Sequence, residues 1–277
     1  MLELSKPAAK RRGRTPGAKN KAAIGQSQSL IRGMTLLERL AEAERGINLS
    51  DLAQQVGLAP STTHRLLNTL EQKRFVHHDE DLGRWFIGVK AFSVGNAFLH
   101  HRDFVAAARP WMHRLMEQAG ETVNLGILDD GEAVFLAQVE CREMMRMIVQ
   151  MGSRAPLHAS GVGKALLAAM SETQVTHILH RRGLARFTAN TLDTPAKLRA
   201  ALADVRRLGY AYDDEEHAVG LRCVAATLYD EHGAPLAAIS VSGPKARILD
   251  ERIPELGAMV ARSAAAITAS LGGHQPT

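Results

Sequence analysis

Cysteine and long apolar runs are nearly missing from this sequence, and each shortage excludes a class of protein. Cys141 and Cys223 are the only cysteines among 277 residues, so neither a disulfide framework nor a zinc site of CxxC pairs is available. So low a count fits a reducing compartment. No apolar run approaches the roughly 20 residues that span a bilayer, and the first residues lack the apolar core of a secretory signal. We therefore expect a cytoplasmic protein that makes no use of a membrane.

Aromatic residues are also scarce. They make up only 4% of the chain, so the buried core must consist mainly of aliphatic side chains. The hydrophobic fraction of 45% and the charged fraction of 23% are nevertheless ordinary for a globular protein. A length of 277 residues exceeds the roughly 100–200 residues of a typical domain, so we expect more than one domain.

The excess of basic charge is confined to one end of the chain. The net charge is +5 and the isoelectric point is about 9.4, which makes nucleic acid a candidate partner. Residues 1–25 hold seven basic side chains and one acidic one, residues 26–95 hold eight of each sign, and residues 96–277 hold nineteen basic and twenty acidic ones. Because residues 1–25 also lack an apolar period, we predict that they form a disordered basic arm.

The arm contains one short motif. Arg12 and Arg14 flank a glycine, and an Arg-Gly-Arg core can lie in the narrow minor groove of A·T-rich DNA. The motif resembles an AT-hook, although Thr15 intervenes before the proline. Attraction of the arm to phosphates without sequence preference is an equal alternative.

Residues 26–88 have the pattern of a winged helix-turn-helix domain, mainly α with a β wing. Apolar residues at helical spacing predict one helix that ends before Gly46 and a second that begins at the N-cap Ser50. A short turn precedes Pro60, which suits the first position of a third helix. Two short apolar strands then flank a polar turn and predict a hairpin, which would be the wing. Such a domain places its third helix in the major groove of double-stranded DNA.

The third helix divides into an apolar and a polar face. At 100° per residue the leucines after position 65 point inward, and the residues that point outward are small, polar or basic. Arginine can read guanine and asparagine can read adenine, while serine and threonine can reach bases or phosphates. We predict that DNA is contacted by Ser61, Thr62, Arg65 and Asn68. The alternative is a three-helix packing module whose polar face meets only solvent.

The remaining chain is predicted to be an α+β domain around an antiparallel sheet. Residues 89–104 should form a linker helix, and residues 105–274 contain two hairpins with helices on either side. Residues 144–149 are predicted to add a further strand. Pro110 should kink or divide the helix in which it lies.

One group of polar residues in this second domain predicts a small binding pocket. Glycines at the start of a helix near Gly161 free backbone N–H groups for a carboxylate. Ser240 and Ser242 share one face of a strand, and Cys223 and Asp213 could lie beside them. Such a set suits a short oxo- or hydroxy-acid, and hydrogen bonding within the sheet alone explains it equally well.

Two chemical alternatives use the same part of the chain. Cys223, His217 and Asp213 have the residue types of a nucleophilic set, although no oxyanion motif accompanies them. Metal binding by His158, His217 and Cys141 lacks a diagnostic spacing. We expect no catalysis, no metal and no cofactor.

Five stretches together carry a family signature: GLAPSTTHRLL at residues 57–67, GETVN at 120–124, PLHASG at 156–161, EEH at 215–217 and SGP at 242–244. With them, residues 26–272 resemble the IclR family of bacterial transcription regulators, and within it are most similar to the glyoxylate-sensing repressors of allantoin utilisation. The resemblance implies a GAF-like effector-binding domain, a homo-oligomer arranged as a dimer of dimers, and palindromic DNA operators. It also implies that glyoxylate is bound by Gly161, Val162, Asp213, Cys223, Ser240 and Ser242, the first two through their backbone N–H groups.

These observations predict a DNA-binding regulator whose operator affinity depends on a small oxo-acid, glyoxylate, in control of glyoxylate-related metabolism. The alternatives are an enzyme that depends on Cys223 and a DNA-binding protein without a ligand. Repression or activation, the operator sequence and the target genes are left open.

Overall fold

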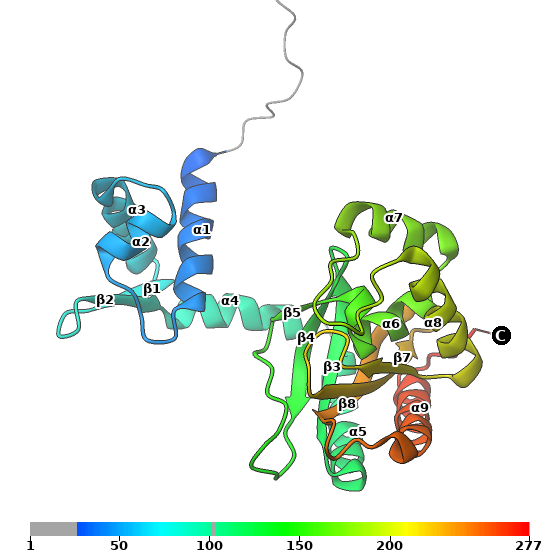
Figure 1. Cartoon of the computed structure of the whole chain (residues 1–277). Helices are drawn as coiled ribbons and strands as arrows, with labels where there is room; N and C mark the ends of the chain where they lie inside the picture. Colours follow the sequence, from blue (N-terminus) through cyan, green and yellow to red (C-terminus); the bar gives the residue numbers. More distant parts are fainter. Residues whose placement is uncertain (1–26, 101–102, 277) are drawn as a thin grey trace, which may run out of the picture. The chain divides into compact units, whose positions relative to one another are not determined.

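The computed structural model describes residues 27–100 and 103–276, and the chain divides into two compact units at residues 98 and 99 (Figure 1). The predicted basic arm, with Arg12 and Arg14, lies outside the described residues. Each unit is described by itself below.

The N-terminal unit is a winged helix-turn-helix, as predicted. Three helices, α1 (Gln28–Glu42), α2 (Leu49–Gln55) and α3 (Pro60–Gln72), are followed by the antiparallel pair β1 (Val76–Asp79) and β2 (Arg84–Ile87). Their core joins the first helix to the wing through side chains that are less than a tenth exposed, namely Leu36, Leu40, Ile47, Leu52, Leu67, Val76 and Trp85. The wing is therefore packed on the helices and is part of the same folded unit.

The N-cap of α2 differs from the prediction. Asn48, not Ser50, precedes the helix, and its side-chain oxygen accepts the backbone N–H of Asp51 at 2.9 Å. Ser50 is already the second residue of the helix. Asparagine and serine are about equally good N-caps, so the sequence offered two candidates and the prediction of Ser50 was wrong.

The C-terminal unit is an α+β fold with helices on both faces of one six-stranded sheet (Figure 1). The sheet is entirely antiparallel in the order β5-β4-β3-β8-β7-β6, with bounds β3 (Thr122–Asp129), β4 (Glu132–Val139), β5 (Arg154–Pro156), β6 (Ala211–Asp214), β7 (Leu221–Tyr229) and β8 (Pro235–Pro244). One face packs on α5 (Asp103–Ala119) and α9 (Ile253–Ser270). The other face packs on α6 (Gly161–Ala168) and α8 (Pro195–Leu208), and α7 (Glu172–Arg182) adjoins them.

One expectation for this unit is wrong, and a second is wrong in part. Residues 144–149 form no strand, because the edge of β4 pairs instead with β5 at Arg154–Pro156. Met144 is 99% exposed and Met145 is 72% exposed, so this part of the segment is not packed on the sheet. Pro110 neither divides nor ends α5, which continues for nine residues beyond it and buries Met112 and Leu115.

The predicted linker helix is present in part. Helix α4 spans Val89–His100, and α5 begins at Asp103. The two residues between these helices are not described. Among the described residues no helix is both long enough and apolar enough to cross a membrane.

Candidate functional site

The outward face of α3 carries all four predicted DNA contacts. A turn with Gly57 at a φ of +64° leads into the helix, and Pro60 begins it without a capping side chain. Thr63 and Leu67 are fully buried on the opposite face. Ser61 and Arg65 are exposed, whereas Thr62 and Asn68 are half-buried at the edges of the polar face. The packing of the apolar side therefore orients this polar face toward solvent.

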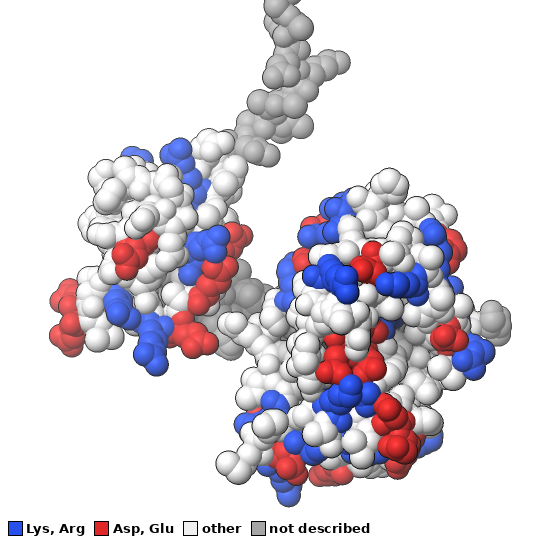
Figure 2. All heavy atoms as spheres, in the orientation of Figure 1, with Lys and Arg blue, Asp and Glu red and all other residues white. Residues whose placement is uncertain are grey.

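The wing presents acidic groups at its tip. Figure 2 shows acidic side chains at the end of the β1–β2 hairpin, whereas the surface seen over α3 is mostly uncharged. Asp79 accepts the backbone N–H of Leu82 at 2.9 Å and so closes the turn. Arg84 donates to the carbonyl of Arg45 at 3.0 Å, which ties the wing to the loop between α1 and α2. The turn at residues 79–83 therefore presents no basic side chain to the phosphates of DNA.

In the C-terminal unit a cavity of about 230 Å³ lies between the sheet and the start of α6. We call it the α6 cavity. Its walls come from β3, β4, β6, β7 and β8, from the first residues of α6, from His217 and from residues 147–150 and 153–155. All six predicted effector residues line it: Gly161, Val162, Asp213, Cys223, Ser240 and Ser242.

Strand register explains why these residues meet. Cys223 on β7 lies opposite Ser242 on β8 and opposite Asp213 on β6. Ser240 is two residues from Ser242 and therefore shares its face. A Cβ added to Gly161 would lie 2.7 Å from Cys223 Sγ, so the close approach of α6 to the sheet requires glycine at this position.

Several hydrogen-bond donors converge on the α6 cavity without protein partners. Ser160 caps α6 by accepting the Gly163 N–H at 3.1 Å. Within the described chain, the preceding N–H groups of Gly161 and Val162 make no hydrogen bond. The hydroxyl of Ser240 is fully buried and also has no partner among the described residues. Because unpaired buried polar groups are costly, this arrangement is that of a site completed by a ligand with acceptor atoms.

Burial also shifts the titration of the acidic groups in the cavity. The pKa of Asp213 is raised to about 7, first by burial and then by the charge of Glu216. Burial, with the nearby charge of Asp213, raises the pKa of the Cys223 thiol to about 11. The buried Lys164 pairs with Glu216 and also donates to the carbonyl of Tyr212. At neutral pH the thiol is therefore protonated, which makes it a weak nucleophile and no obstacle to an anion.

Comparison with known proteins identifies the chain. The IclR helix-turn-helix domain matches residues 29–80, and the C-terminal domain of the bacterial transcriptional regulator IclR matches residues 96–269. The chain belongs to the IclR family of bacterial transcriptional regulators. It is a DNA-binding regulator and not an enzyme, which confirms both the family resemblance and the expectation of no catalysis.

Relatives of known role are similar over nearly their whole length. The acetate operon repressor of Salmonella typhimurium is 50% identical over 96% of this chain and 98% of the relative. The transcriptional repressor AllR of Escherichia coli is 43% identical over 95% of this chain and 97% of the relative. The crystal structure of the Thermotoga maritima IclR has a TM-score of 0.75 and 28% identity, and it covers 88% of this chain and 98% of that structure. Identity is therefore higher with the acetate operon repressor than with AllR.

The α6 cavity of this IclR family member also contains residues that sequence reasoning did not assign to it. Asn124 on β3 lines the wall beside Ser242, and the available signal was an amide side chain between the apolar residues Val123 and Leu125. Met147 also lines the cavity, whereas Met145 and Met151 are exposed. No cluster of three potential metal ligands occurs among residues 27–100 and 103–276.

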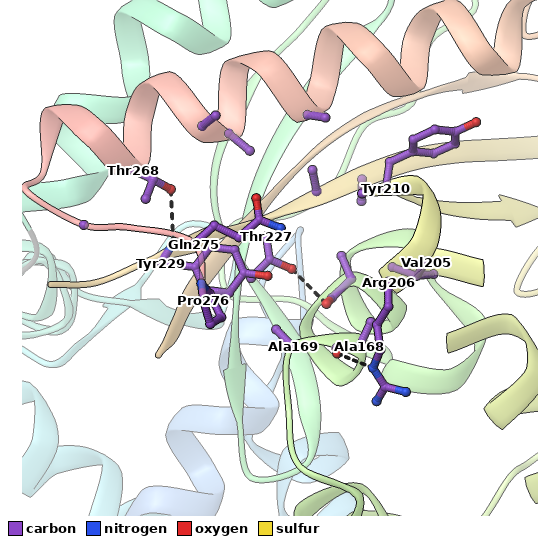
Figure 3. A pocket seen from close by; sticks show the side chains of 18 of the residues that line it. Ala168, Ala169, Val205, Arg206, Tyr210, Thr227, Tyr229, Thr268, Gln275 and Pro276 are labelled. Carbon is purple, nitrogen blue, oxygen red and sulfur yellow. Dashed lines mark hydrogen bonds between the residues drawn. The ribbon is translucent and has the colours of Figure 1, made fainter. Parts of the chain in front are cut away.

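A second, larger cavity of about 600 Å³ lies between α6, β7, α9 and the C-terminal residues (Figure 3). Its polar groups are largely paired with each other. The Tyr229 N–H donates to Thr268 Oγ1 at 3.1 Å, Thr227 Oγ1 donates to the carbonyl of Ala165 at 2.8 Å, and Arg206 Nε donates to the carbonyl of Ala168 at 2.9 Å. The smaller α6 cavity, with its unpaired donors, is therefore the better candidate for a binding site.

Proposed function

We propose that this IclR family protein is a transcriptional repressor whose affinity for its operator is set by a small oxo-acid, glyoxylate, bound in the α6 cavity. The observation that carries the proposal is the set of unpaired donors there. The N–H groups of Gly161 and Val162 lie at the positive end of α6, and the buried Ser240 hydroxyl has no partner among the described residues. A carboxylate is the ligand that a helix N-terminus favours.

The remaining polar groups are suited to the second functional group of an oxo-acid. Ser242 and Cys223 lie opposite each other on adjacent strands, and Asp213 completes this side of the cavity. They can hydrogen-bond the aldehyde oxygen of glyoxylate or the hydroxyls of its hydrate. A cavity of about 230 Å³, with a few polar groups converging among apolar side chains, favours a short acid over a long one.

Repression is supported by the relatives. The acetate operon repressor and AllR are both named as repressors and both align with nearly the whole chain. We propose that control extends to genes of glyoxylate-related carbon or nitrogen metabolism, and that the protein acts in the cytoplasm. The ligand would alter operator affinity by favouring one of two arrangements of the protein.

DNA would be read by Ser61, Thr62, Arg65 and Asn68 from α3, with the arm of residues 1–25 adding affinity through phosphates. We propose a dimer of dimers on a palindromic operator, because symmetric dimers of helix-turn-helix domains bind paired half-sites. Exposed apolar side chains on the N-terminal unit support self-association: Leu30 and Met34 on α1 are 59% and 52% exposed, and Phe92 on α4 is 70% exposed.

The test is a calorimetric titration of glyoxylate, followed by DNA binding with and without it. Wild-type protein should bind glyoxylate, and the Ser240→Ala variant should bind it at least tenfold more weakly because a buried donor is lost. Thr227→Ala is the matched control, since its hydroxyl already donates to the carbonyl of Ala165 outside the α6 cavity. Equal binding by the Ser240→Ala variant would contradict the assignment of the cavity.

The DNA measurement separates the proposal from a ligand-independent binder. Fragments from the region upstream of the gene should be retarded by the protein, and saturating glyoxylate should change the affinity. DNA binding that stays the same in glyoxylate and in other short oxo- and hydroxy-acids would support the ligand-independent alternative.

A further inference from the structure

A short line of side-chain hydrogen bonds leads from the α6 cavity to the segment that follows β4. Asn124 Nδ2 donates to Ser242 Oγ at 3.3 Å. Gln138 Nε2 donates to Asn124 Oδ1 at 2.7 Å, and the Val149 N–H donates to Gln138 Oε1 at 3.5 Å. Asn124 is 1% exposed and Ser242 is 4% exposed, so both partners of the first bond are buried.

The donor and the acceptor of every bond in this line follow from the last bond, between Val149 and Gln138. A backbone N–H can only donate, so the group of Gln138 that faces Val149 is its oxygen. The Gln138 amide nitrogen then faces Asn124, and the Asn124 oxygen must accept from it. The Asn124 amide nitrogen is left to face Ser242, whose oxygen accepts.

This order has a consequence for the cavity. Because Ser242 Oγ already accepts from Asn124, its own hydrogen points away from Asn124, toward the ligand or toward the Cys223 thiol on the neighbouring strand. A serine hydroxyl without such a neighbour could rotate and serve as donor or acceptor.

We propose that Asn124 is a positioning residue that fixes Ser242 as a hydrogen-bond donor to the effector, with Gln138 setting the orientation of Asn124. The inference rests on the proposed function, because it assumes an effector in the α6 cavity. It adds a specificity rule: the ligand atom next to Ser242 is an acceptor, such as a carboxylate or carbonyl oxygen. An acid with only a donor at that position binds more weakly, since it leaves the Ser242 hydrogen without the ligand as its acceptor.

The test compares the cost of Ser242→Ala in two backgrounds, with glyoxylate as the titrated probe. In the wild type the loss of this donor should weaken binding about 10- to 100-fold. In an Asn124→Asp background the carboxylate accepts from both neighbours, so the Ser242 hydroxyl turns away from the cavity. Ser242→Ala should then cost less than threefold, whatever Asn124→Asp itself costs.

Ser240→Ala is the matched control in the same cavity. Ser240 is not part of the hydrogen-bond line, so its substitution should cost the same factor with Asn124 as with Asp at that position. If Ser242→Ala also costs the same factor in both backgrounds, Asn124 does not orient Ser242 and the proposal is overturned.

A second variant tests the proposal even if the buried aspartate of Asn124→Asp prevents folding. Gln138 is only half-buried, and Gln138→Glu can accept from Val149 but cannot donate to Asn124. The Asn124 amide should then turn over and present its oxygen to Ser242, with the same loss of the Ser242 contribution. A full contribution of Ser242 in this variant would also overturn the proposal.

A measurement without ligand separates this inference from the proposed function. By NMR, the side-chain amide protons of Asn124 should exchange at least tenfold more slowly than those of a free asparagine, and Ser242→Ala should speed the exchange. If glyoxylate does not bind but this protection is observed, the proposed function fails and the orientation of Ser242 stands. Exchange as fast as in a free amide overturns the inference even if glyoxylate binds.

Discussion

Replacing Asp213 by asparagine should stabilise the C-terminal unit at alkaline pH while weakening the cavity as a binding site. Asp213 is 3% exposed, and its pKa is raised from 3.8 to about 7, chiefly by burial. Asparagine keeps the size of the side chain and can still accept the Glu216 N–H, which Asp213 Oδ1 accepts at 2.8 Å. It removes only the charge that folding disfavours.

The sign and the size of the effect follow from the shifted titration. The folded protein holds the proton more tightly than the unfolded chain, so the penalty is absent below a pH of about 4 and grows as the pH rises. It is complete above a pH of about 7. The shift from 3.8 to about 7 corresponds to about 4 kcal/mol of lost stability, as an upper value. The stabilisation by Asp213→Asn should therefore be about 3 kcal/mol larger at pH 8.5 than at pH 5.

Urea unfolding can follow the C-terminal unit alone. Of the two tryptophans, Trp85 lies in the core of the N-terminal unit and Trp111 packs against the core formed with α5. A Trp85→Phe background leaves Trp111 as the fluorescent reporter. A difference in unfolding free energy that is the same at both pH values would refute the reasoning, because it would show that the asparagine acts through packing.

Asp214→Asn is the matched control on the same strand. Asp214 Oδ1 accepts from Arg222 Nε at 2.7 Å, and the Arg222 side chain is only 4% exposed. Asparagine keeps an acceptor oxygen but removes the carboxylate charge, which leaves a buried guanidinium with one counter-charge fewer, so the control should lower the unfolding free energy. If Asp213→Asn raises the unfolding free energy and Asp214→Asn lowers it, a general effect of removing a carboxylate from β6 is excluded.

Three further predictions concern DNA and ligand binding. Arg65→Ala should weaken specific operator binding by about 1–3 kcal/mol while glyoxylate still binds, and retained operator affinity in a filter-binding assay would contradict the role of Arg65. Gly161→Ala should abolish glyoxylate binding, because its Cβ would lie 2.7 Å from Cys223 Sγ, and calorimetry should find binding partly restored by adding Cys223→Ala. Deletion of residues 1–25 should weaken DNA binding and reduce its salt dependence, by a slope of about 0.9 for each phosphate that the arm neutralises in the full chain, and an unchanged slope would exclude the arm from the interface.

The sequence predicted the helix-turn-helix better than the sheet because its signals are local. The turn before Pro60 and the leucine spacing of α3 lie within a few residues of each other. The cavity depends instead on pairings between distant parts of the chain. Thr122 on β3 pairs with Ser242 on β8, and β6 was not recognised as a strand at all. The six cavity residues were grouped by strand parity and family resemblance, and only the register brings them together.

The failures have physical causes of the same kind. Residues 144–149 have side chains that favour a strand, but the edge of β4 pairs with β5 instead. Asn124 was overlooked as a cavity residue because no sequence pattern shows that Gln138 and Ser242 lie on either side of it. The role of an isolated polar residue on a buried strand depends on hydrogen-bond partners from distant parts of the chain, which only the fold brings next to it.

The α6 cavity combines features that oppose stability, and these features explain how binding of a small anion could shift an equilibrium of the protein. The Ser240 hydroxyl is buried without a partner in the described structure, and the folded unit disfavours ionised Asp213. A ligand can shift an equilibrium only by binding one state better than the other. An acid that pairs with Ser240 and the α6 N–H groups recovers a cost already present in the cavity, and its negative charge further favours protonated Asp213. At these positions we therefore expect protein stability and the response to ligand to oppose each other. Variants that relieve the cost should be more stable and should respond less to the ligand.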